Sequence, residues 1–223
     1  MRELSIFADE AGLQDMSEGY YLLTLVMHDQ SEDIDNHTAE YERQLPVGGL
    51  RDVPFHMVDL LHGHSDYEGL DAITRKRLLS RFNAFVRRLP ISYHTFSYSA
   101  YDVSGMWELS ARMRRDLVDF VYRHFERFRS FDRAIVYYDD GQLAVTKALH
   151  ECFDYMLGDD MVEYKRLRYQ DRRLSQVADY LSSVELAAQR YAEGTESNTY
   201  HKFYGLKGDL KTNYLKQIRR KAI

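Results

Sequence analysis

The stretch LSIFADEAG, residues 4–12, decides the fold that the sequence predicts. Leu4 to Ala8 form a short apolar run of the kind found in buried strands. Asp9 and Glu10 close that run, and Gly12 follows as a turn residue. A strand that ends in a carboxylate fits the centre of an open α/β sheet, because ligands bind there outside the carboxyl ends of the strands.

Four more strands and six helices are expected outward from this stretch. The strands cover Tyr20 to Met27, Ile91 to Ser99, Arg133 to Tyr138 and Met161 to Tyr169. The helices cover Ser31 to Gln44, Ile73 to Leu89, Met106 to Phe128, Val145 to Met156, Leu174 to Ala188 and Leu206 to Arg220. The glycine-punctuated segment from Pro46 to Gly69 is expected to be irregular.

The order is therefore two strands, a helical insertion, a third strand, and then alternating helices and strands. This is the order of the α/β fold called ribonuclease-H-like, a mixed five-stranded sheet flanked by helices. In it the first strand lies beside the fourth and parallel to it. Because no Ser/Gly-rich linker divides the chain, we expect one domain over residues 1–223. Its insertion between strands 2 and 3 covers about 31–89, and a basic C-terminal extension covers about 195–223.

The composition excludes several classes of protein. A single cysteine, Cys152, excludes an intrachain disulfide and a multi-cysteine zinc site, and it fits a reducing compartment. No apolar stretch approaches the ~20 residues that span a bilayer. The chain also lacks a phosphate-binding glycine loop, a nucleophile elbow and a dinucleotide fingerprint. We expect a cytoplasmic protein without membrane contact, and its oligomeric state stays open.

Three acidic signatures lie far apart in the chain, around Asp9, Asp139 and Asp179. The first two close predicted strands that would be neighbours, and adjacent strands lie ~4.8 Å apart. Carboxylate oxygens are ligands of hard divalent cations, so Mg²⁺ or Mn²⁺ is the expected cofactor. In a two-ion site, Asp9 would bridge the ions, while Asp139 and Asp179 would each complete one shell. The structural alternatives are a turn residue for Asp9 and a favourable helix-start charge for Asp179.

Other polar residues near these signatures are weaker candidates. Gln176 lies one helical turn before Asp179 and could orient a ligand or a water molecule. His56 could contact phosphate or act as an acid or base. Glu10 should point away from Asp9 and receives no ligand role, whereas Glu108 is a candidate fourth acid.

A second candidate cluster consists of His56, Asp59, His62 and His64 in the sequence FHMVDLLHGH. Histidines with an aspartate can bind zinc, which would make the chain a metal hydrolase of another kind. The spacing matches no metalloenzyme signature, and a solvated loop is the alternative interpretation.

Basic residues are concentrated in two places although the formal net charge is −5. The first is Lys165 to Arg173, with Arg166, Arg168 and Arg172 between them, and the second is the tail from Asn198 to Ile223. Such clusters bind phosphates, so nucleic acid is the expected partner. The alternatives are a solvated helix face and a ragged terminus.

The three signatures together resemble the domain-of-unknown-function 3800 family of bacteria and phages. Its Asp-Glu-Ser-Gly, strand-ending Asp and Gln-x-Ala-Asp motifs resemble Asp9 to Gly12, Val136 to Asp139 and Gln176 to Asp179. Phe55-His56 resembles a histidine of many members, and Ala11 departs from the usual serine. Either Asp139 or Asp140 could match the central acid. The resemblance implies a ribonuclease-H-like fold and a nuclease-type site.

Two hypotheses about function follow from these observations. The first is a divalent-metal-dependent nuclease or phosphodiesterase that acts on nucleic acid through Asp9, Asp139 and Asp179. The second is a catalytically inert ribonuclease-H-like module that binds nucleic acid or a protein partner and needs the basic surface but no metal.

Overall fold

Five strands form one open mixed sheet in the order β3-β2-β1-β4-β5. They are β1 (Glu3–Gly12), β2 (Tyr20–Asp29), β3 (Ser92–Ser99), β4 (Arg133–Tyr138) and β5 (Val162–Arg166). The structure is a computed structural model, and it describes residues 1–12, 19–139, 141–167 and 172–223. All five strands were predicted from the sequence; the end of the last one, at Tyr169, lies outside the described residues.

The strand β1 occupies the centre of the sheet, as expected. It pairs antiparallel with β2 from Leu4↔Asp29 to Gly12↔Tyr21, and parallel with β4 from Glu3↔Arg133 to Phe7↔Tyr137. The prediction that the first strand lies beside the fourth and parallel to it is therefore confirmed. Pairing with β2 extends β1 beyond its predicted end at Ala8, so Asp9 and Glu10 lie within a strand.

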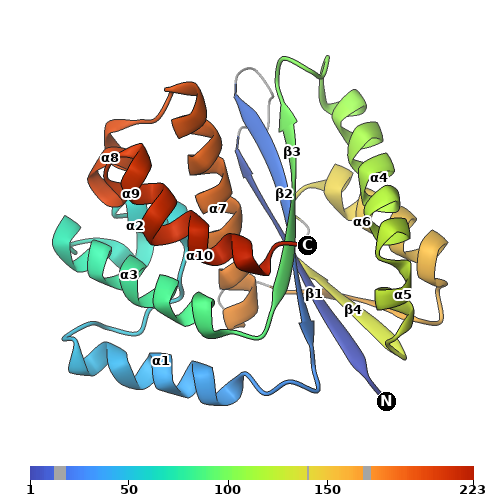
Figure 1. The fold of residues 1–223 in the computed structure, drawn as a ribbon, viewed down its shortest axis with the longest axis horizontal. Coiled ribbons are helices and arrows are strands. Elements are labelled where there is room, and N and C mark those ends of the chain that lie inside the picture. Colours follow the sequence, from blue (N-terminus) through green and yellow to red (C-terminus); the bar gives the residue numbers. More distant parts are fainter. Residues whose placement is uncertain (13–18, 140, 168–171) are drawn as a thin grey trace.

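Helices cover both faces of the sheet (Figure 1). One face carries α4 (Met106–Arg123), α5 (Phe125–Arg129) and α6 (Leu143–Leu157). The other carries α7 (Arg173–Glu193), with α1 (Asp35–Val47), α2 (Met57–His62) and α3 (Ala72–Arg88) packed outside it. None of the helices in the described part of the chain is long and apolar enough to cross a membrane.

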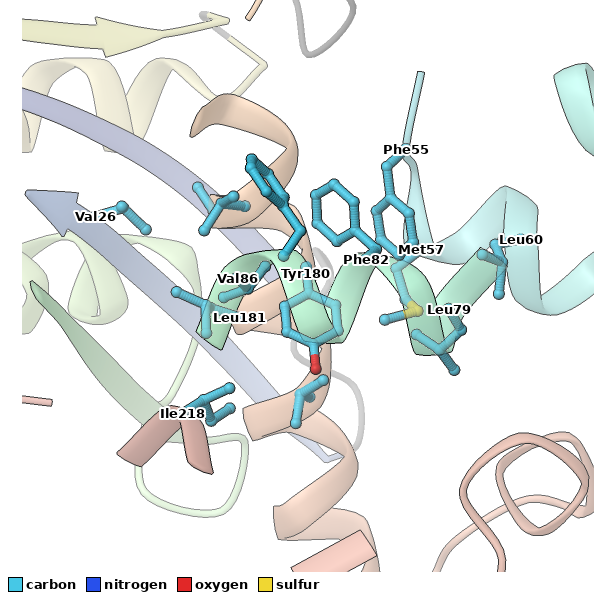
Figure 2. Close-up of a cluster of buried hydrophobic side chains, with 14 of the residues drawn as sticks. Val26, Phe55, Met57, Leu60, Leu79, Phe82, Val86, Tyr180, Leu181 and Ile218 are labelled. Carbon is cyan, nitrogen blue, oxygen red and sulfur yellow. The ribbon is translucent and has the colours of Figure 1, made fainter. Parts of the chain in front are cut away.

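The core on the α7 side joins that helix to the segment between β2 and β3. Figure 2 shows Tyr180 and Leu181 of α7 beside Phe82 and Val86 of α3, with Phe55 at the edge of the cluster. The rings of Phe55 and Phe82 stack with centroids 3.8 Å apart. Burying five large apolar side chains of this kind contributes on the order of 10 kcal/mol. This core fixes α2 against the middle of α7.

The helices between β2 and β3 differ from the prediction in one respect. The segment from Pro46 to Gly69 is not wholly irregular, because α1 continues to Val47 and α2 forms within the segment. Gly63, at φ 78°, ends α2 in the left-handed conformation that glycine adopts readily. Met57, Leu60 and Leu61 of α2 face the core, although six residues are too few to show a clear helical period.

Two further expectations are corrected in the α4–α5 region and the tail. The helix predicted from Met106 to Phe128 breaks at His124, which leaves α5 as a separate turn. The helix predicted from Leu206 to Arg220 is present as a continuous helical run that changes type along its length: α9 (Lys207–Leu210), a π-helical turn (Lys211–Leu215), α10 (Lys216–Ile218) and a 3-10 turn (Arg219–Lys221). With α8 (Asn198–Tyr204), they bury several apolar side chains, so the C-terminal extension is packed onto the α7 side.

Candidate functional site

Asp9 and Asp179 meet on the α7 face of the sheet. Phe7 faces the α7 core, and side chains alternate along a strand, so Asp9 lies on the same face. Burial raises the pKa of Asp9 well above its usual range, and the next largest cause is the charge of Asp179. Asp179 is 6% exposed, and burial raises its pKa to about 6. The Met57 backbone N–H, which donates to Asp179 Oδ2 at 2.6 Å, opposes that rise.

Asp139 lies directly beyond the end of β4 and is exposed. Its Oδ1 accepts a hydrogen bond of 2.8 Å from the Gly141 backbone N–H. Its charge is one of those that raise the pKa of Asp9, so the structure brings all three predicted acids to one edge of the sheet. The alternative central acid, Asp140, lies outside the described residues.

Glu10 lies on the opposite face of β1 from Asp9, as the sequence predicted. Its Oε1 accepts a 2.8 Å hydrogen bond from the Tyr138 hydroxyl, which in turn accepts one of 2.9 Å from Gln142 N–H. Burial raises the pKa of Glu10 to about 7, and the charge of Asp139 adds to the rise. The Tyr138 hydroxyl therefore holds the Glu10 carboxylate near the end of β4.

Gln176 and Arg173 lie in the first turn of α7. Gln176 is 2% exposed, and its Oε1 accepts a 3.1 Å hydrogen bond from Arg173 Nη1. Arg173 also pairs with Glu42 at 2.8 Å and with Asp52 at 2.6 Å. The prediction that Arg173 holds substrate phosphate is therefore weakened, because its charge is already balanced by two carboxylates. Its role in the structure is to fix the start of α7 and the side chain of Gln176.

The histidine segment reaches the acidic edge through His56 and Asp59. His56 Nδ1 lies 3.0 Å from Asp59 Oδ2. The charge of His56 lowers the pKa of Asp179 against the larger effect of burial, and the charge of Asp59 raises it. His62 and His64 stack on each other instead, with ring centroids 5.8 Å apart. The histidine-loop hydrolase gains no support from this arrangement.

The remaining basic residues of the Lys165–Arg173 stretch flank the edge. Lys165 and Arg166 line a hollow of about 460 Å³ between β5 and α6, together with His150, Tyr164 and Tyr138. Lys165 Nζ also lies 3.3 Å from Glu163. The Arg172 guanidinium is 5.0 Å from the centre of the Tyr137 ring. Arg168 lies outside the described residues.

Carboxylate oxygens are suitable ligands for a hard divalent cation, but these carboxylates lie too far apart to bind one as they are placed. Among the described residues, no group of three or more His, Cys, Asp or Glu side chains is placed closely enough to hold a metal ion. Asp139 turns one oxygen to Gly141 N–H, and Asp179 turns one to Met57 N–H. A cation would need the carboxylates to rotate toward one another, and it would relieve their repulsion.

The candidate fourth acid, Glu108, does not join this set. Its carboxylate accepts hydrogen bonds from Ser104 N–H at 2.8 Å and from Arg112 Nη2 at 2.7 Å. These bonds, with that of the Ser104 hydroxyl, lower its pKa to about 2. Glu108 stabilises the start of α4, and Glu10 is the fourth acid at the edge.

No family model matches the chain, and the search of curated proteins found no match either.

Proposed function

We propose that this protein is a divalent-metal-dependent nuclease or phosphodiesterase of the ribonuclease-H-like class, related to the domain-of-unknown-function 3800 family. One observation carries the proposal: Asp9 is surrounded by Asp179, Glu10 and Asp139, and each of these carboxylates raises its pKa. Like charges gathered at the carboxyl edge of an α/β sheet favour a cation-binding site. The strand order, with β1 and β4 parallel at the centre, is consistent with this class.

The residues divide into three roles in this proposal. Asp9, Asp139 and Asp179 would hold Mg²⁺ or Mn²⁺, which when bound neutralises phosphate charge and lowers the pKa of a bound water. Gln176 is held by Arg173 near the first turn of α7, where it orients groups that approach Asp179. His56, held by Asp59, would provide a hydrogen-bonding group for phosphate.

Nucleic acid is the proposed substrate because basic side chains flank the acidic edge. Lys165 and Arg166 border the hollow beside Tyr138, and Arg172 lies over Tyr137. Lys165 and Arg166 end β5 and Arg172 directly precedes α7, so these side chains follow the same edge as the carboxylates. A phosphodiester chain lying along that edge would contact the basic side chains and the metal site together.

Calorimetric titration with Mn²⁺ tests the metal site without requiring the right substrate. We expect wild type to bind Mn²⁺ and D9N to lose most of that affinity while remaining folded. D160N, which alters an exposed turn aspartate, is the matched control and should bind like wild type. EDTA-sensitive cleavage of single- and double-stranded DNA and RNA then tests the activity. A wild-type protein that binds no Mn²⁺ overturns the proposal and favours the inert binding module.

A further inference from the structure

The hollow between β5 and α6 lies beside the acidic edge but differs from it in charge. Among the described residues, those that line it include two basic side chains, Lys165 and Arg166, and no aspartate or glutamate. Its volume of about 460 Å³ falls within the ~300–1,000 Å³ that small-molecule pockets occupy. The size and the charge of this hollow therefore favour a small organic anion as its ligand.

Two tyrosine rings form part of its wall, and hydrogen bonds hold both of them in place. Tyr138 of β4 and Tyr164 of β5 lie on the face of the sheet that α6 covers. The Tyr138 hydroxyl donates to Glu10 Oε1 at 2.8 Å, and the Tyr164 hydroxyl donates to Asp154 Oδ1 at 2.6 Å. His150 stacks on Tyr164, with ring centroids 3.5 Å apart. This wall is preformed, so a ligand need not order it on binding.

Apolar side chains and basic groups lie at the same hollow. Val136 and Leu149, which are buried, add apolar surface to the wall, and Leu143 at the start of α6 is 83% exposed although it is apolar. Lys165 and Arg166 are exposed. A flat aromatic ring that carries a phosphate satisfies both kinds of surface, because the ring packs on the apolar wall and the phosphate pairs with the basic groups. Nucleotides have this chemistry.

We propose that the hollow binds one unpaired nucleotide of the substrate, with its base against Leu143 and the two tyrosine rings and its phosphate at Lys165 and Arg166. A base enclosed between a strand and a helix is out of the stack, so the substrate strand is unpaired at this position. The bond from Tyr138 to Glu10 places the nucleotide beside the carboxylates. This inference rests on the proposed function, and it names the form of the nucleic acid that the site takes.

Calorimetric titration with deoxyadenosine monophosphate (dAMP), in the presence of EDTA, tests the hollow without the metal site. We expect wild type to bind one dAMP per chain. Deoxyadenosine lacks the phosphate and inorganic phosphate lacks the base, so each should bind at least about tenfold more weakly than dAMP.

The phosphate contact is tested by K165Q, which removes a charge at the hollow. We expect it to weaken dAMP by about tenfold and to leave deoxyadenosine unchanged. K147Q is the matched control. Lys147 is an exposed lysine of α6 that lies 3.7 Å from Glu151, much as Lys165 lies 3.3 Å from Glu163, but it is not among the residues that line the hollow. K147Q should bind dAMP like wild type.

The base contact is tested by L143S, which removes apolar surface at the hollow. We expect it to weaken dAMP and deoxyadenosine alike, by about fivefold. I73S is the matched control, because Ile73 is also exposed, at 71%, and lies in α3 on the other side of the sheet. It should bind dAMP like wild type. Thermal unfolding of each variant shows that the protein tested is folded.

Competition tests whether the nucleotide must be unpaired. A single-stranded oligonucleotide should displace dAMP, and the same strand annealed to its complement should do so at least about tenfold less well, because a base must first leave the duplex. Equal displacement by the two forms would overturn the requirement for an unpaired nucleotide.

The possible outcomes separate the two proposals. Wild type that binds no dAMP, or dAMP binding that K165Q and L143S both leave unchanged, would overturn the nucleotide site, and Mn²⁺ binding by the same protein would leave the proposed function standing. Binding of dAMP that both variants weaken, in a protein that binds no Mn²⁺, would support the nucleotide site and overturn the proposed function.

Discussion

The helix α7 carries two charged residues whose surroundings are opposite. Arg173, in its first turn, lies between Glu42 and Asp52 and over the ring of Tyr41, at 5.3 Å from the ring centre. Asp179, less than two turns further on, faces Asp9, and the side-chain charges that act on Asp9 are all carboxylates. The same helix therefore holds the charge of Arg173 with two ion pairs, whereas burial raises the pKa of Asp179 although the charge of His56 and the Met57 N–H both oppose the rise.

The Arg173 cluster stabilises the fold, whereas the acidic edge belongs to the proposed site and destabilises the fold. The Arg173 cluster joins α7 to the segment before α2, so its ion pairs stabilise the packing of that segment. The acidic edge costs stability at neutral pH, because burial and repulsion both disfavour the ionised carboxylates. Proteins tolerate such costs at functional sites, where stability and activity oppose each other.

The largest expected effect comes from removing the balanced charge. R173M should lower the free energy of unfolding by about 2–3 kcal/mol, because it removes two ion pairs and the bond to Gln176. Since Glu42 and Asp52 are each 44% exposed, water can solvate them afterwards, which keeps the loss below the ~3–5 kcal/mol expected for a fully buried pair. Urea unfolding at pH 7 measures the change.

R172M provides the matched control for this substitution. Arg172 is exposed and lies over the Tyr137 ring, so its loss should cost less than about 1 kcal/mol. If R173M and R172M are equally stable, the Arg173 ion pairs contribute nothing, and the contrast within α7 disappears.

The sequence predicted the strands and their order because their signal is local. Runs such as LSIFA, residues 4–8, are short, apolar and bounded by turn residues, and Ile91 to Ser99 alternates along the strand. The helix α2 was missed because its packing depends on residues distant in sequence. Met57 and Phe55 contact α3 and α7, and nothing in the local sequence shows those partners.

The acidic edge was predicted only in part. Asp9 and Asp139 were found because each follows an apolar run, and Asp179 because of its motif. Glu10 was set aside on the rule that neighbours on a strand face opposite ways, which holds here. What the rule could not show is that β1 extends to Gly12 and that Tyr138 and Gly141 direct both carboxylates to one loop.

Removing the charge of Asp179 should have an effect of opposite sign and no larger size. The pKa of Asp179 is about 6 in the folded protein against an ordinary 3.8, so its ionisation disfavours folding. That cost is complete above about pH 6 and disappears as the pH falls to about 4. D179N should therefore be more stable than wild type at pH 7, by at most about 3 kcal/mol, and the difference should vanish near pH 4.

Urea unfolding of both proteins between pH 4 and pH 8, with EDTA present, measures this difference. The asparagine oxygen can still accept from Met57 N–H, so D179N isolates the charge. D179A, which also loses that bond, should gain less. A D179N protein that is less stable than wild type at pH 7 would show that the acidic edge is a structural feature and not a strained site.

The smallest effect is expected at Glu108, which has the opposite pKa shift from the acids of the edge. Its pKa is lowered to about 2 from an ordinary 4.5, first by the Ser104 N–H and then by the Ser104 hydroxyl and Arg112. Its charge therefore stabilises the fold fully above about pH 4.5, and this contribution is lost as the pH falls through about 2. E108Q should be slightly less stable than wild type at pH 7, and the two should converge in acid. Thermal unfolding of E108Q and D179N over one pH series gives difference curves of opposite sign. Curves of the same sign would mean that the two carboxylates do not differ in their surroundings, and the distinction between a balanced charge and an unbalanced one would fail.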